Sequence, residues 1–281
     1  MGKRVTTADL VEAKRAGRKI VAVSCYDYTT ARLVAQADVD MVLVGDSAAQ
    51  ILLGFESTLP ASMDFMVMMT EAVRRGNPDA YLVADMPFLS YQVGCDEAVR
   101  NAGRFVTEAG AQMIKVELSR AYLDVIKAIS DAGMAVMAHI GILPQAIGKL
   151  GRLRAEGTTS EMAAGLAALA DQAIEAGASA LLIEGTAAEV ASIITQRSDV
   201  PVIGCGSGPG CDGQILIAAD ILGLTERRPK FAASMANLAE ASITAFSAYS
   251  HHVRVGTFPD DSLCYHMKPG ELELLHSRLQ G

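Results

Sequence analysis

Short, uninterrupted apolar runs recur along the chain, separated by stretches with helical periodicity. A run of this length without polar alternation indicates a strand buried on both faces, as in a parallel sheet. We therefore predict parallel strands at 20–24, 41–45, 80–85, 113–117, 135–140, 180–184 and 201–205, with a weaker eighth at 219–224.

Helix-like segments lead into several of these runs through a small-residue turn. The phrases EAGAQMIKVE (108–117), DAGMAVMAHIG (131–141) and EAGASALLIEG (175–185) share this pattern, and 36–47 is a looser copy. Gly or Asp ends the helix in each phrase, and a strand follows. Eight strands alternating with helices favour an α/β fold with a single closed (β/α)8 (TIM) barrel over an open doubly wound sheet.

No linker-like or low-complexity stretch divides the chain, so we predict one domain over residues 1–281. Residues 231–253 read as a final helix. Residues 254–281 read as a C-terminal helical extension, with a short helix at 270–279.

Composition narrows the classes of protein that this chain can represent. A formal charge of -8 argues against a nucleic-acid partner. No apolar run approaches the roughly 20 residues that would span a membrane. The five cysteines include no CxxC pair, and the N-terminal segment has no signal-like apolar region. We therefore expect a cytoplasmic protein with reduced thiols.

Acidic residues stand where the apolar runs end. Asp46, Asp85, Glu117 and Glu184 each close or directly follow a run, and His139 lies within another. The carboxyl ends of parallel strands share one rim of a barrel, where active sites are built. Two carboxylates about 4 Å apart repel by roughly 4 kcal/mol at an effective dielectric constant near 20. Acidic residues gathered at one rim would therefore recruit a hard cation such as Mg2+. The alternative is that each of them caps the helix that follows its strand.

The sequence resembles the ketopantoate hydroxymethyltransferase (3-methyl-2-oxobutanoate hydroxymethyltransferase) family. The resemblance covers about residues 5–260. It is carried in order by VGDSAAQILLGFESTLP (44–60), ADMPF (84–88), KVE (115–117), AHIGILPQ (138–145), LLIEG (181–185), GCGSGPGCDGQIL (204–216) and PKFA (229–232). The combination of these motifs is specific, although none is specific alone.

The resemblance implies a pantothenate-biosynthesis enzyme that forms a carbon–carbon bond. A magnesium-stabilised enolate of 3-methyl-2-oxobutanoate would attack the methylene of 5,10-methylenetetrahydrofolate and give 2-dehydropantoate (ketopantoate). The resemblance also implies a homo-oligomer, a decamer in this family.

The resemblance assigns roles residue by residue. Glu184 would be the catalytic base that removes the C3 proton. The implied metal ligands are Asp46, Asp85 and Glu117, the last directly or through water; the implied substrate-binding residues are Asp46, Ser47, Asp85, Lys115 and His139. Lys115 is also hard to explain as structure, because an unpaired inward lysine is costly.

Two segments depart from the family pattern. AIGKLGRLRAEG (146–157) replaces an asparagine- and glycine-rich loop, which bears on the identity of the second substrate. GCGSGPGCDG (204–213) is also altered, and we expect a flexible loop over the barrel mouth there, in contact with the folate. It lacks the spacing of a phosphate-binding loop.

Two alternatives stay open at this point. The first is a folate-independent, magnesium-dependent aldolase or lyase of the isocitrate lyase and phosphoenolpyruvate mutase superfamily, acting on another 2-oxo acid. That superfamily often carries a catalytic cysteine in a KKCGH-like phrase, which this chain lacks. The second is a non-catalytic oligomeric scaffold, which would not be expected to retain competent residues at every one of these positions.

Overall fold

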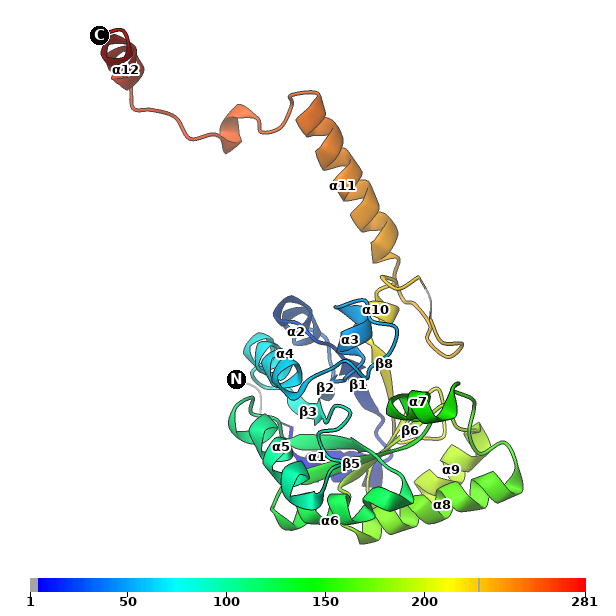
Figure 1. Ribbon diagram of the computed structural model, residues 1–281. Coiled ribbons are helices and arrows are strands. Elements are labelled where there is room, and N and C mark those ends of the chain that lie inside the picture. Colours follow the sequence, from blue (N-terminus) through cyan, green and yellow to red (C-terminus); the bar gives the residue numbers. More distant parts are fainter. Residues whose placement is uncertain (1–4, 227) are drawn as a thin grey trace. The chain divides into compact units, whose positions relative to one another are not determined.

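The computed structural model describes residues 5–226 and 228–281. Eight parallel strands close into a barrel in the order in which they occur along the chain, so the predicted (β/α)8 barrel is confirmed (Figure 1). The strands are β1 (Ile20–Ser24), β2 (Met41–Val44), β3 (Tyr81–Asp85), β4 (Met113–Glu117), β5 (Ala135–Gly141), β6 (Ala180–Glu184), β7 (Val202–Cys205) and β8 (Gly213–Ile217).

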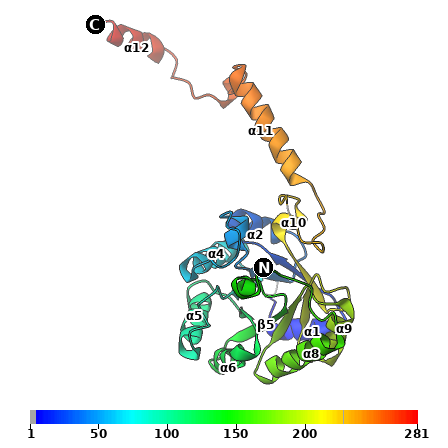
Figure 2. The ribbon, with the colours of Figure 1, turned by 45° about the vertical axis from the view of Figure 1, so that its right-hand side comes forward.

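Helices surround the strands, as the two views in Figures 1 and 2 agree. Helix α4 shows why: Ser62 caps its first turn, and its buried face carries Met66, Val67 and Val73. The helices up to β8 are α1 (Thr7–Arg15), α2 (Tyr28–Val34), α3 (Ala48–Ile51), α4 (Met63–Gly76), α5 (Cys95–Thr107), α6 (Leu123–Asp131), α7 (Ile147–Leu150), α8 (Ser160–Glu175) and α9 (Ala188–Arg197), with 3-10 turns η1 (Arg120–Tyr122) and η2 (Pro144–Ala146).

Successive side chains of each strand point alternately into the barrel and toward the surrounding helices, so the hydrophobic core has an inner and an outer part. In β2, Val42 and Val44 belong to the cluster between strands and helices, whereas Met41 and Leu43 belong to the cluster inside the barrel. The interior cluster also contains Leu10 of α1. Because α1 packs there, apolar side chains fill the barrel interior below the carboxyl ends of the strands.

The eighth strand is β8 (Gly213–Ile217), so the prediction at 219–224 is wrong. Most of that run lies in the short helix α10 (Ala218–Ile221) and the turn after it. The cause is the connection from β7 to β8, which spans only residues 206–212 and contains no helix. Spacing based on a strand–helix repeat therefore placed the strand too late.

The glycine-rich connection between β7 and β8 also differs from the prediction of a loop over the barrel mouth at 204–213. A Cβ at Gly208 or Gly210 would clash with Ala188 or Ser192, which are both residues of α9. Gly213 then pairs with Ile20, the first residue of β1. Residues 208–212 thus run along α9 toward the amino-terminal end of the barrel, and the prediction of a loop over the mouth is wrong for them.

Residues 236–281 form a second compact unit. It contains α11 (Leu238–Arg254), the 3-10 turn η3 (Asp261–Leu263) and α12 (Glu271–Leu279). The helix predicted at 231–253 begins only at Leu238, where the Asn237 side chain caps Glu240, and the helix predicted at 270–279 is confirmed. The single domain over 1–281 stays a prediction. Among the described residues, no helix has the length and apolar character needed to cross a membrane.

Candidate active site

Alternation along the strands places polar side chains at the carboxyl end of the barrel interior. In β4, Lys115 and Glu117 lie two and four residues after the interior residue Met113, so they are on the same face of the strand. In the same way, Asp85 lies two residues after the interior residue Val83 in β3, and Glu184 lies two residues after Leu182 in β6. Because residues two apart face the same side of a strand, the last residues of these strands point inward above the apolar filling. His139 follows Met137 in β5 in the same way.

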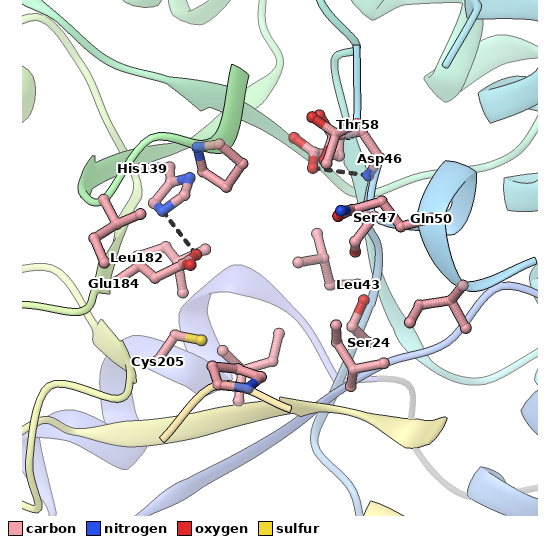
Figure 3. Close-up of a pocket in the computed structure, with 18 of the residues that line it drawn as sticks. Ser24, Leu43, Asp46, Ser47, Gln50, Thr58, His139, Leu182, Glu184 and Cys205 are labelled. Atoms are coloured by element: carbon pink, nitrogen blue, oxygen red, sulfur yellow. Dashed lines mark hydrogen bonds and ion pairs between the residues drawn. The ribbon is translucent and has the colours of Figure 1, made fainter. Parts of the chain in front are cut away.

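These side chains surround a cavity of about 750 Å³. Asp46, Ser47, Asp85, Lys115, His139 and Glu184 all line it. Figure 3 shows Asp46 and Ser47 on one side, with His139 and Glu184 across from them. Apolar side chains such as Leu43, Leu182 and Ile215 complete the lining. This volume and mixture are typical of a small-molecule site.

Asp85 and Lys115 form a buried ion pair. Lys115 Nζ lies 2.7 Å from Asp85 Oδ2, and both side chains are at most 5% exposed. Asp85 Oδ2 also accepts a hydrogen bond from the Asp46 backbone N–H at 3.1 Å. One oxygen of this carboxylate is therefore fixed twice, whereas the other, Oδ1, is buried without a hydrogen-bond partner among the described residues.

Glu117 is held in a similar way. Its Oε2 accepts a hydrogen bond from the Gln145 backbone N–H at 3.0 Å, and its buried Oε1 has no hydrogen-bond partner in the part of the chain that the structure describes. Glu117 is absent from the cavity lining, so it lies behind the residues that face the cavity. It approaches the site through His139, whose Nδ1 is 3.8 Å from Glu117 Oε1.

Burial dominates the protonation equilibria of these groups. Loss of hydration raises the pKa of Asp85 to about 7, although Lys115 opposes this effect, and it raises the pKa of Glu117 well above its usual range. Burial and the charge of Lys115 lower the pKa of His139, which favours a neutral imidazole. Lys115 is the exception: burial acts to lower its pKa, but the neighbouring carboxylates together outweigh this effect, so the pKa is raised and the lysine stays charged.

His139 and Glu184 face each other across a longer gap. His139 Nε2 lies 3.4 Å from Glu184 Oε2 (Figure 3). Neither ring nitrogen makes a hydrogen bond of good geometry within the described residues. The Glu184 side chain is 21% exposed to solvent, whereas that of His139 is buried.

The oxygen atoms fit a hard divalent cation. Within the described residues, one buried oxygen of Asp85 and one of Glu117 have no hydrogen-bond partner, and the cavity adds the carboxylate of Asp46. A Cβ at Gly45 would fill a space ringed by the hydroxyls of Ser47 and Ser24 and by Asp85 Oδ2, at 3.0, 3.3 and 3.8 Å. No group of three or more His, Cys, Asp or Glu side chains in residues 5–226 and 228–281 could hold a metal ion alone. Mg2+ does not need such a cage, because it is bound through one or two carboxylates and keeps several waters.

The structure adds polar residues that sequence reasoning missed. Ser24 and Cys205 end β1 and β7 and line the cavity. Each lies two residues after an interior residue, Ala22 or Ile203, and this spacing could have identified them. Gln145 and Tyr91 lie behind the lining and hold it together, and no periodic signal in the sequence marks them.

Comparisons with known proteins show to which family the chain belongs. The sequence profile described as ketopantoate hydroxymethyltransferase matches residues 4–261. The 3-methyl-2-oxobutanoate hydroxymethyltransferase of Moorella thermoacetica is 46% identical over 258 residues, which cover 92% of this chain and 96% of the relative. The enzyme of that name from Hyperthermus butylicus is 46% identical over 273 residues, covering 97% and 94% of the two chains.

Solved structures of other enzymes share the fold. A 2,3-dimethylmalate lyase, described as a PEP mutase/isocitrate lyase superfamily member, has a TM-score of 0.59 at 18% identity and covers 99% of this chain and 100% of its own. A phosphonopyruvate hydrolase in complex with oxalate and Mg++ has a TM-score of 0.60 at 16% identity, covering 98% and 97%. These likenesses show a common barrel, whereas the profile and the relatives identify the family. The chain belongs to the ketopantoate hydroxymethyltransferase family.

Proposed function

We propose that this enzyme transfers a hydroxymethyl group from 5,10-methylenetetrahydrofolate to 3-methyl-2-oxobutanoate, giving 2-dehydropantoate (ketopantoate) for pantothenate and coenzyme A biosynthesis. One observation carries the proposal. The carboxylates, the lysine and the neutral histidine that proton abstraction next to a ketone requires meet at one cavity. They do so in a chain that is 46% identical to relatives named for this reaction.

Asp46 and Asp85 would hold Mg2+ directly, and Glu117, behind the lining, would hold it through water. When bound, the cation supplies Lewis-acid stabilisation of the negative charge that develops on the substrate oxygens. Lys115 keeps Asp85 in place through the 2.7 Å ion pair. It retains further N–H donors that can reach a substrate carboxylate.

Ser47 would bind the substrate carboxylate together with Lys115. The Ser47 hydroxyl lies 2.7 Å from the Tyr26 hydroxyl, which fixes its position at the cavity wall. Leu43, Leu182 and Ile215 offer the apolar surface that a branched side chain needs. Oriented in this way, the substrate presents its C3–H bond to the opposite wall.

Glu184 would act as the base that removes the C3 proton. It stands across the cavity from Asp46 and Ser47 (Figure 3). A protonated histidine at 3.4 Å would stabilise the carboxylate and weaken it as a base, but the lowered pKa of His139 favours the neutral ring. A well-placed base accelerates such a step about 10²–10⁴-fold. The resulting carbon nucleophile forms a bond to the folate methylene carbon as one of its two C–N bonds breaks. Water then supplies the hydroxyl group as the second C–N bond breaks, and the two folate nitrogens take up the C3 proton and a proton from water, which gives ketopantoate and tetrahydrofolate.

The remaining properties follow from family membership and stay proposals. We propose that the enzyme acts in the cytoplasm as a homo-oligomer, a decamer. The folate-independent aldolase or lyase alternative gains nothing beyond the shared barrel, because the lyase and hydrolase structures named above are only 16–18% identical to this chain.

The test is a reconstitution with purified enzyme. It is incubated with Mg2+ and 3-methyl-2-oxobutanoate, with and without 5,10-methylenetetrahydrofolate, and ketopantoate is followed by mass spectrometry. We expect the product only in the complete mixture. Cleavage or condensation of the 2-oxo acid without folate would instead support the lyase alternative, and no reaction in any mixture would contradict the proposed function.

A further inference from the structure

Gln145 is a buried amide that the proposed reaction does not yet use. It lies in η2, which follows β5 and begins at Pro144. Gly141 ends β5 with a φ of +95°, and a Cβ there would clash with the Glu184 carbonyl. This tight passage and the proline at the start of η2 direct the chain back over the barrel rim. Gln145 is 5% exposed as a result.

Both ends of the Gln145 side-chain amide and its backbone N–H have specific partners. Its Nε2 donates to Asp46 Oδ2 and to the Met86 carbonyl, both at 2.9 Å. Its backbone N–H donates to Glu117 Oε2 at 3.0 Å. Its Oε1 accepts from the Tyr91 hydroxyl at 2.8 Å and from Gln92 Nε2 at 3.2 Å. One residue thus contacts two of the three carboxylates assigned to the metal.

These partners allow only one orientation of the amide. A carboxylate oxygen and a backbone carbonyl can only accept hydrogen bonds, so the atom that faces Asp46 and Met86 must be the NH2 group. The Tyr91 hydroxyl also contacts the Glu117 carbonyl at 3.1 Å, which anchors the far side of the amide. Gln145 is therefore fixed at both ends.

We propose that Gln145 is a positioning residue that fixes Asp46 as a ligand for the divalent cation and connects it to Glu117 behind. The inference rests on the magnesium part of the proposed function. By occupying Oδ2 of Asp46, the amide turns the carboxylate so that its other oxygen is left for the cation. Outer partners of this kind typically change metal affinity or activity by 10–100-fold when they are lost.

The test measures Mg2+ affinity directly, by titration calorimetry of the metal-free full chain without substrate. Gln145→Leu keeps the approximate volume and the backbone N–H but removes the amide, and we expect its Mg2+ Kd to rise about 10–100-fold. Tyr91→Phe keeps the ring and removes the hydroxyl that contacts Gln145 Oε1 and the Glu117 carbonyl, while Gln145 keeps its bond to Asp46, so its Kd should rise by a smaller factor. Gln92→Leu is the matched control, because Gln92 contacts Gln145 but no carboxylate in the described hydrogen bonds. It should bind Mg2+ like the wild type.

A second readout separates positioning from simple structural support. Thermal unfolding is measured without Mg2+ and with Mg2+ at one fixed concentration near the wild-type Kd, where Gln145→Leu should lose most of the stabilisation that Mg2+ gives the wild type. An unchanged Kd in Gln145→Leu, even with a lower melting temperature, would overturn the inference. If Gln145→Leu does not fold, Tyr91→Phe decides: a raised Kd supports the inference, and a wild-type Kd overturns it. A wild type that binds no Mg2+ would overturn the metal part of the proposed function itself.

Discussion

The two walls of the cavity hold their polar groups differently. On the wall formed by Asp46, Asp85 and Lys115, contacts between N and O atoms lie at 2.7–3.1 Å. On the opposite wall, His139 and Glu184 are 3.4 Å apart and make no hydrogen bond of good geometry. The side chain of Asp85 is 1% exposed, whereas that of Glu184 is 21% exposed.

This difference matches two chemical tasks. A wall that binds a cation and a carboxylate works best when its groups are fixed before the ligand arrives, because no reorganisation is then needed. A base must instead accept a proton and later release it, so its oxygen cannot be committed to a strong donor. The wall of Asp46, Asp85 and Lys115, called the rigid wall below, is thus suited to binding. The wall of His139 and Glu184, called the open wall below, is suited to proton transfer.

The largest expected effect comes from breaking the rigid wall at Asp46. Asp46→Asn keeps the shape of the side chain and removes its charge, so Mg2+ should bind poorly. Because a bound cation supplies several kcal/mol of transition-state stabilisation, turnover should fall by more than about 10³-fold. Chelation of the wild type should have an effect of the same size, and added Mg2+ should reverse it.

Steady-state ketopantoate formation at several Mg2+ concentrations measures this loss. Circular dichroism of the variant checks that the barrel is intact. Full activity of Asp46→Asn at ordinary Mg2+ concentrations would show that Asp46 is not a ligand.

The next effect concerns stability and compares a buried ion pair with an exposed one. Lys115→Met leaves Asp85 buried without its partner, and we expect a loss of about 3–5 kcal/mol in the free energy of unfolding. Lys127→Met is the matched control, because Lys127 Nζ also lies 2.7 Å from a carboxylate, that of Asp131, but both side chains are more than 60% exposed. Exposed pairs of this kind contribute less than about 1 kcal/mol.

Urea unfolding at pH 8, above the pKa of about 7 of Asp85, gives both values. On the open wall, Glu184→Gln should change stability little, because no described hydrogen bond of good geometry to His139 is lost. Equal losses in Lys115→Met and Lys127→Met would contradict the idea that the rigid wall is held by its buried pair.

The smallest effect is a pH dependence of metal binding. Because burial raises the pKa of Asp85 to about 7, this carboxyl is mostly protonated in the metal-free protein below pH 7. Mg2+ must then displace the proton, so its affinity should rise about tenfold per pH unit below pH 7 and level off above it. Calorimetry in buffers of different ionisation enthalpy should detect proton release at pH 6. A pH-independent affinity between pH 5.5 and 8 would argue against Asp85 as a ligand.

The sequence predicts the seven strands that are preceded by a helix, and the prediction fails at β8, which no helix precedes. Strands from β1 to β7 were found because each is a continuous apolar run in a regular strand–helix alternation. The β7–β8 connection breaks this alternation, so Ile215 was missed and Ile221, in a helix, was assigned to a strand. A local pattern cannot show that a helix is absent from the next connection.

The grouping of site residues was predictable, but their partners were not. Asp85, Glu117 and Glu184 end strands of one barrel, so their shared rim follows from topology. No local pattern indicates that Lys115 pairs with Asp85 or that Gln145 turns back toward Asp46, because these contacts join residues 30 and 99 positions apart. Such pairs depend on side-chain packing at the rim, which periodicity does not describe.

The central claim is that Glu184 is a base on a wall separate from the metal-binding wall, and isotope exchange tests it most directly. Wild type and Glu184→Gln are incubated with Mg2+ and 3-methyl-2-oxobutanoate in deuterated water without folate, and loss of the C3 hydrogen is followed by NMR. We predict exchange in the wild type and a rate lower by about 10²–10⁴-fold in Glu184→Gln, with Mg2+ and oxo-acid affinities nearly unchanged. Wild-type exchange in Glu184→Gln would contradict the account and would make His139 the next candidate for the base.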